Sequence, residues 1–199
     1  LAQLIPHNDW ESILLHTLYK YPNILDGLNA ELTMKRTNKK EMEQREVMMF
    51  PYPELMFNAF ALCPFKDVRV VILGQDPYHN ILDGVPQAMG LSFSVPTGIK
   101  IPSSLQNINK NLEDNNNINV KPKHGNLTAW AKQGILLLNS ALTVRYDNAN
   151  VHENLWKRFT DDIIRIISKH KENVVFVLWG GTAIKKKNMI DADKHKTIC

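Results

Sequence analysis

Three short runs of apolar residues stand out along the chain, at residues 68–73, 135–138 and 174–178. They are apolar almost throughout and rich in branched side chains, which is typical of parallel strands covered on both faces. Amphipathic helical patterns lie between them, around residues 105–112 behind Ser103 and Ser104 and around residues 156–167. Residues 195–199 can open a further strand. The pattern predicts an α/β fold with a central, mainly parallel four-stranded sheet and helices on both faces.

The rest of the chain predicts supporting structure. Trp10, Leu14 and Leu18 fall at helical spacing behind Asn8, a candidate helix cap with Glu11 three residues on. Residues 37–45 are charged and typical of a solvated surface. The asparagine-rich residues 115–119 predict a surface loop.

Length and composition narrow the class of protein. With 199 residues, 44% hydrophobic and 22% charged, the chain predicts a single domain over residues 1–199. No apolar run approaches 18 residues, so we expect no membrane partner. The first residue is Leu1 rather than methionine, so the sequence leaves open whether a targeting segment preceded it and was removed. A net charge of +4 suits an anionic partner such as nucleic acid, but it is common in proteins that bind none.

Cysteine usage predicts a reduced, intracellular protein. The only two cysteines, Cys63 and Cys199, are too few for a disulfide scaffold or a four-cysteine metal site. We therefore expect no metal and no cofactor.

Polar or glycine-bearing segments follow each apolar run, where open α/β sheets bind ligands. They are residues 74–79 (Gly-Gln-Asp-Pro-Tyr-His), Asn139 with Ser140, and residues 179–182 (Trp-Gly-Gly-Thr) with three lysines beyond. Taken singly, each has a plain structural interpretation: an Asp-Pro turn, a capping asparagine, a glycine turn and a solvated lysine face. Only their combination indicates a site.

That combination resembles family 1 uracil-DNA glycosylases. Residues 74–79 resemble the family's water-activating motif, and residues 90–95 (Gly-Leu-Ser-Phe-Ser-Val) its uracil-stacking segment. Residues 102–108 resemble the loop that grips DNA, and residues 130–145 the strand with the uracil-reading asparagine. The resemblance runs in the family's order from residue 68 to residue 199, which makes chance agreement implausible.

The resemblance implies a role for each motif residue. The catalytic residues would be Asp76, which activates water, and His79, which supports it; alone, His79 is more simply structural. The uracil-binding residues would be Gln75, Tyr78, Phe93 and Asn139, and the DNA-backbone contacts Ser103, Ser104, Gly180 and Gly181. Phe93 has an alternative interpretation as a core residue, because the alternation over residues 91–95 also fits a half-buried strand.

The implied reaction flips uracil out of DNA and hydrolyses its bond to deoxyribose, as in base excision repair. The expected partner is uracil-containing DNA, single- or double-stranded, bound by a monomer in a compartment that holds DNA.

Three departures from the family weaken parts of this interpretation. The connection at residues 80–89 is longer than usual, Ser103 stands where proline is customary, and Gly181 stands where a phosphate-contacting serine is customary.

A further departure concerns the end of the chain. Family members continue into a loop with a histidine and a leucine, which would follow Cys199. If the chain is complete, we expect severely weakened catalysis. A first residue other than methionine and an end within a predicted strand favour a fragment instead. The alternative is a DNA-binding or replication-accessory protein that has lost turnover.

Overall fold

Four parallel strands form the central sheet of the protein, in the computed structural model that describes residues 1–33, 35–37, 44–46, 48–115 and 122–199. The strands are β4 (Val70–Gly74), β7 (Ile135–Asn139), β9 (Val175–Leu178) and β10 (Lys196–Ile198). Their order is β10-β9-β4-β7, and every neighbouring pair is parallel. The predicted α/β sheet is therefore confirmed, including its fourth strand near the end of the chain.

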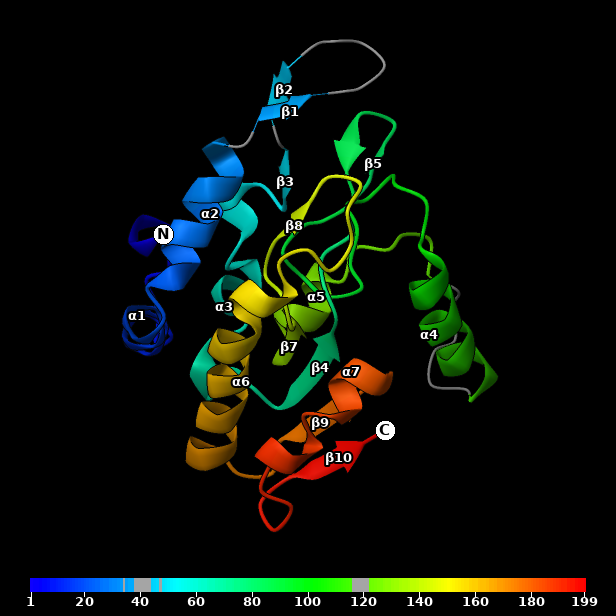
Figure 1. Ribbon diagram of the computed structural model, residues 1–199. Coiled ribbons are helices and arrows are strands. Elements are labelled where there is room, and N and C mark those ends of the chain that lie inside the picture. Colours follow the sequence, from blue (N-terminus) through cyan, green and yellow to red (C-terminus); the bar gives the residue numbers. More distant parts are fainter. Residues whose placement is uncertain (34, 38–43, 47, 116–121) are drawn as a thin grey trace.

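Helices cover both faces of this sheet (Figure 1). On one side lies α6 (Glu153–His170), which buries Trp156, Phe159 and Ile163 against the core. The helices α1 (Glu11–Lys20) and α2 (Asn23–Thr33) pack against α6. On the other side stands α4 (Ser103–Asp114). None of the helices in the described ranges is long and apolar enough to cross a bilayer.

Shorter elements complete the described structure. Three are helices close to the sheet: α3 (Asn58–Leu62), α5 (Thr128–Ala131) and α7 (Gly181–Ile184). Four are 3₁₀ turns: η1 (Ala2–Leu4), η2 (Pro53–Leu55), η3 (Phe65–Asp67) and η4 (Lys187–Met189). The remaining strands form antiparallel pairs: β1 (Lys35–Thr37) with β2 (Gln44–Glu46), β3 (Met49–Phe50) with β8 (Val144–Arg145), and β5 (Ile81–Leu82) with β6 (Val85–Pro86).

Two predicted helix starts differ from the structure. Asn8 does not cap α1, whose N-cap is Trp10. The side-chain oxygen of Asn8 instead accepts a 2.9 Å hydrogen bond from the backbone N–H of Trp10, and the side-chain amide of Asn8 donates to the carbonyl of Phe60 at 3.1 Å. Asn8 thus fixes the turn before the helix. Ser103 and Ser104 lie inside the first turn of α4, because Pro102 takes the N-cap position.

Two predicted surface segments fall partly outside the described residues. Of the charged segment 37–45, Thr37 ends β1 and residues 44–45 belong to β2, while residues 38–43 are not described. Of the asparagine-rich segment, only Asn115 is described, as the C-cap of α4.

Both cysteines are free thiols. Cys63 is buried in the core and Cys199 is exposed. Burial raises the pKa of the Cys63 thiol to about 12, so this thiol stays protonated and unreactive near neutral pH.

Candidate active site

The carboxyl ends of β4 and β7 bring two of the motifs together. Gly74, the last residue of β4, pairs with Asn139, the last residue of β7. Beyond this pair, the carbonyls of Gly74 and Gln75 accept 3.0 Å hydrogen bonds from the backbone N–H groups of Ser140 and Ala141. A Cβ at residue 74 would fall 2.2 Å from Oδ1 of Asn139. Only glycine therefore lets the Asn139 side chain occupy its present place.

Four of the predicted site residues line one small pocket at this edge of the sheet. Asp76, Tyr78, Phe93 and Asn139 all contribute to its wall, together with Pro77 and residues 88–91. The free volume is about 10 Å³, which is room for roughly one water molecule. The pocket is therefore narrow in this structure.

The Asp76 carboxylate is held by a backbone donor from a distant loop. Its Oδ2 accepts a 2.7 Å hydrogen bond from the N–H of Asn150. Asn150 has a left-handed backbone with φ +63°, a conformation that asparagine tolerates better than most residues. The loop thus orients Asp76 and leaves its other oxygen for a further partner.

Phe93 lies in a turn, so the alternative interpretation of residues 91–95 as a strand is wrong. Its backbone has φ +63°, which is strained for a bulky residue. Neighbouring serines hold it there. Ser92 donates its N–H to Leu137 at 3.0 Å and its hydroxyl to Ile72 at 3.2 Å, and the Ser94 hydroxyl accepts from the N–H of Leu127 at 2.9 Å. The result aims the Phe93 ring at the pocket.

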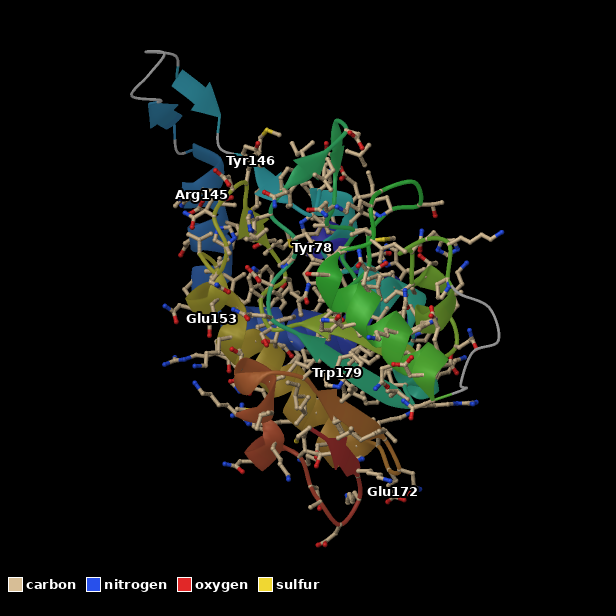
Figure 2. The ribbon with its side chains drawn as sticks, turned by 90° about the vertical axis from the view of Figure 1, so that its right-hand side faces the viewer. Tyr78, Arg145, Tyr146, Glu153, Glu172 and Trp179 are labelled. Carbon is tan, nitrogen blue, oxygen red and sulfur yellow. The ribbon has the colours of Figure 1, made fainter. Side chains whose placement is uncertain are left out.

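Tyr78 connects the pocket to the start of α4. Its hydroxyl lies 3.3 Å from the carbonyl oxygen of Phe93 and 3.2 Å from Oγ of Ser104; Figure 2 shows Tyr78 above the beginning of α4. Burial raises the pKa of the phenol above its usual value. Tyr78 therefore contributes a neutral side chain to the wall of the pocket.

Comparisons with known proteins identify the family. Residues 60–197 match the Uracil DNA glycosylase superfamily. The uracil-DNA glycosylase of Helicobacter hepaticus is 51% identical over 160 residues, which cover 78% of this chain and 68% of that protein. The uracil-DNA glycosylase of Borrelia turicatae is 52% identical over 158 residues, covering 79% and 69%.

The chain belongs to the uracil-DNA glycosylase superfamily.

Solved glycosylase structures share its architecture. Mimivirus uracil-DNA glycosylase, at 36% identity, matches with a TM-score of 0.87 over 98% of this chain and 68% of that chain. The enzyme of Nitratifractor salsuginis, at 16% identity, matches with a TM-score of 0.62 over 97% of this chain and 83% of that chain, and shows the fold alone. The chain spans about two thirds of the length of its curated relatives and of the mimivirus enzyme.

Two motif residues of the glycosylase pattern lie outside the pocket wall. Gln75 is exposed, and its side-chain amide donates to Oδ1 of Asn150. The His79 carbonyl accepts a 3.0 Å hydrogen bond from the N–H of Asp147. Among the described residues, nothing hydrogen-bonds the buried Nδ1 of His79. Contact of Gln75 with uracil and support of water by His79 stay predictions.

The four predicted DNA-backbone contacts lie on two exposed segments beside the glycosylase pocket. Ser103 is exposed at the start of α4, and Ser104 contacts Tyr78. Gly180 has φ +85°, a conformation that favours glycine, and it is the N-cap of α7. A Cβ built at Gly180 or Gly181 meets no heavy atom of the described structure within 4 Å. Open space at both glycines leaves the backbone accessible to a phosphate.

Sequence reasoning assigned no role to two residues that contact the pocket wall. Asn150 orients Asp76 through its backbone N–H, a group that every residue but proline carries, so no side-chain pattern indicates it. Trp179 packs its ring against Phe93. Its position directly after the third apolar run was the available signal.

Proposed function

We propose that this protein hydrolyses the N-glycosidic bond of deoxyuridine in DNA, which releases free uracil and leaves an abasic site. The observation that carries the proposal is the convergence of Asp76, Tyr78, Phe93 and Asn139 on one pocket. An acid, a phenol, an aromatic ring and an amide are the groups that this reaction needs. With DNA as its substrate, the protein acts in a compartment that contains DNA.

Asp76 serves the bond-breaking step. Cleavage develops positive charge on the sugar and negative charge on the leaving base, as in other glycosyl transfers. A carboxylate beside the sugar stabilises the cation and deprotonates or orients the attacking water. Asn150 holds one carboxylate oxygen, which leaves the other to face water. His79, whose Nδ1 has no hydrogen-bond partner among the described residues, is proposed to hold a further water near the motif.

Asn139 distinguishes uracil from cytosine. Held in one orientation, its side-chain amide offers a donor and an acceptor that match the carbonyl and N–H of uracil and mismatch the amine and ring nitrogen of cytosine. Asn139 is 8% exposed, so a mismatched base would leave nearly buried polar groups unpaired, which costs about 1–3 kcal/mol for each group.

Tyr78 and Phe93 recognise the shape of the ring. Phe93 offers a flat apolar surface for the flipped base. Thymine differs from uracil by one methyl group, and Tyr78 forms the wall that excludes it. Both side chains line the narrow pocket.

DNA must be held on both sides of the flipped nucleotide, because extrusion of a base costs a few kcal/mol. Ser103 and Ser104 at the start of α4 and the turn at Gly180 and Gly181 are proposed to hold the phosphates. Backbone and hydroxyl groups of this kind contact phosphates without reading sequence. Selectivity therefore comes from the pocket and affinity from the surrounding turns.

The decisive experiment measures free uracil released from a uracil-containing single-stranded oligonucleotide. Replacement of Asp76 by asparagine should lower the rate about 10²- to 10⁴-fold, the usual contribution of general acid–base catalysis. Asp83→Asn is the matched control, because Asp83 is an exposed carboxylate on the turn between β5 and β6. Equal rates for the protein and its Asp76→Asn variant would remove Asp76 from the mechanism. Binding of uracil-containing DNA without release would instead favour a DNA-binding protein of the same fold.

A further inference from the structure

One carboxylate on α2 contacts both ends of the loop that orients Asp76. The loop consists of residues 146–151, between β8 and α6. Glu31 contacts Arg145, directly before the loop, and His152, directly after it. Glu31 is more than a hundred residues away along the chain and does not line the pocket.

The contact with Arg145 is a two-pronged ion pair. Nε of Arg145 donates to Oε2 of Glu31 at 2.8 Å, and its Nη2 donates to Oε1 at 2.5 Å; Figure 2 shows Arg145 against α2. Such paired bonds fix direction as well as distance. The Arg145 hydrogen bonds hold the pKa of the Glu31 carboxyl below its usual value, which keeps it ionised near neutral pH.

The contact with His152 follows from an ordered chain of donors. Nε1 of Trp156 donates to the Thr143 hydroxyl at 2.7 Å, and this hydroxyl lies 2.9 Å from Nδ1 of His152. Because the indole can only donate, the arrangement that pairs both the indole and Nδ1 has Thr143 donating to Nδ1. The imidazole proton then sits on Nε2, which lies 3.5 Å from Oε2 of Glu31 without the geometry of a hydrogen bond.

Between these two anchors, the loop carries the donor that Asp76 uses. The N–H of Asn150 bonds Oδ2 of Asp76 at 2.7 Å. Two further backbone bonds hold the near end of the loop: Tyr146 donates to Met48 at 2.8 Å, and Asp147 donates to His79 at 3.0 Å. At the far end, where Asn150 lies, the N–H of Glu153 bonds the carbonyl of Asn150 at 3.1 Å, and His152 provides the side-chain anchor.

We infer that Glu31 is a positioning residue for Asp76, acting through the 146–151 loop. The inference rests on the proposed function, since it assigns Glu31 to the same site. Loss of the carboxylate removes the two-pronged ion pair from Arg145 and the nearby charge from His152, so the loop between these two residues can shift. A misplacement of about 1 Å at a catalytic group can cost about 10²-fold in rate. DNA binding is spared, because none of these residues belongs to the proposed DNA contacts.

Glu31→Gln tests the inference, with Glu31→Ala as a second variant that also removes the remaining acceptor. The expected result is a kcat for uracil release lower by about 10- to 100-fold, with the KM for the oligonucleotide changed less than about threefold. Exchange of the Asn150 amide hydrogen with solvent, followed by NMR, should accelerate in both variants. This second measurement reads the Asn150–Asp76 bond directly and needs no turnover.

Asp162→Asn is the matched control. The Asp162 side chain is 14% exposed, as is that of Glu31, and it contacts two cations, Lys20 and Arg165. It lies on α6 away from the pocket wall. The control should lower the unfolding temperature about as much as Glu31→Gln, while kcat and the exchange rate of the Asn150 amide stay as in the unaltered protein.

The outcomes separate this inference from the proposed function. Unchanged kcat and unchanged Asn150 exchange in both Glu31 variants would overturn the inference, as would an equal loss of kcat in Asp162→Asn. The Asp76→Asn variant is assayed alongside. If it is as active as the unaltered protein, the proposed function fails, whereas a large loss there with fully active Glu31 variants overturns only the role of Glu31.

Discussion

The ring of Trp179 packs edge-on against the ring of Phe93, with centroids 5.8 Å apart and planes at 74°. Trp179 directly follows β9 and precedes Gly180, whereas Phe93 lines the pocket. The contact therefore joins the proposed base-binding surface to the turn proposed to hold a phosphate. A change in the position of either ring would therefore alter this contact.

Replacement of Trp179 by leucine should weaken both folding and substrate binding. The residue is 40% exposed, and an edge-to-face pair contributes about 0.5–1.5 kcal/mol beyond its buried area. We expect the free energy of unfolding in urea to fall by about this amount together with the contribution of the lost buried area, while KM for uracil-containing DNA rises severalfold. An unchanged KM would show that the ring does not support the pocket.

Two replacements of Tyr78 should distinguish the role of its ring from the role of its hydroxyl. Tyr78→Ala opens the wall and should admit thymine, detected as thymine released from a normal oligonucleotide. Tyr78→Phe keeps the ring and should still reject thymine, although it loses the contacts with Phe93 and Ser104. If the alanine variant released no thymine while still releasing uracil, methyl exclusion would lie elsewhere in the wall.

A methyl group at residue 74 should displace the uracil-reading amide. In Gly74→Ala the new Cβ would lie 2.2 Å from Oδ1 of Asn139 and 2.9 Å from Cβ of Ser92. Overpacking of this kind costs about 1–3 kcal/mol of stability, and we expect kcat/KM for uracil release to fall about 10²-fold. The loss of stability and the fall in kcat/KM can both be measured, the latter at a temperature at which the variant is folded. Full activity in this variant would mean that Asn139 does not need its present position.

A serine at residue 181 should strengthen DNA binding. A side chain there meets open space within the described structure, and a hydroxyl can donate to a phosphate, a charged acceptor that makes such a bond worth about 1.5–3 kcal/mol. We expect Gly181→Ser to lower the Kd for DNA about tenfold or more, measured by fluorescence anisotropy. Because serine adds no charge, the dependence of Kd on salt should stay the same. A Kd no lower than that of the unaltered protein would argue against a phosphate at this turn.

The stability of the protein should fall as the pH drops below about 6.5, partly through His152. Burial lowers the pKa of His152 below its ordinary value of 6.5, despite the opposing attraction of Glu31. The unfolded chain then binds a proton that the folded protein does not, so acid favours unfolding, by up to about 1.4 kcal/mol per pH unit. In urea unfolding from pH 8 to pH 5, His152→Gln should flatten this decline. Parallel curves for the two proteins would exclude His152 as the titrating group.

The sequence alone predicted the sheet and the residues of the pocket. Runs such as residues 135–138 are apolar at every position. Strands that are covered on both faces have this pattern, whereas strands with one wet face alternate apolar and polar residues. A few consecutive residues were therefore enough to predict the parallel sheet. Asp76, Tyr78, Phe93 and Asn139 were indicated because their motifs follow one another in the order of a known family. Both predictions depend on information that is local in the chain.

Only the tertiary structure decided how those residues are held. The bond from Asn150 to Asp76, the left-handed turn at Phe93 and the clamp of Glu31 on the 146–151 loop are made by groups far apart along the chain. Backbone N–H groups are the same at nearly every residue, so a sequence does not mark which of them a carboxylate will meet. Local patterns therefore determined the elements and the reactive side chains, and the packing of α2, the loop and the strand ends determined their orientation.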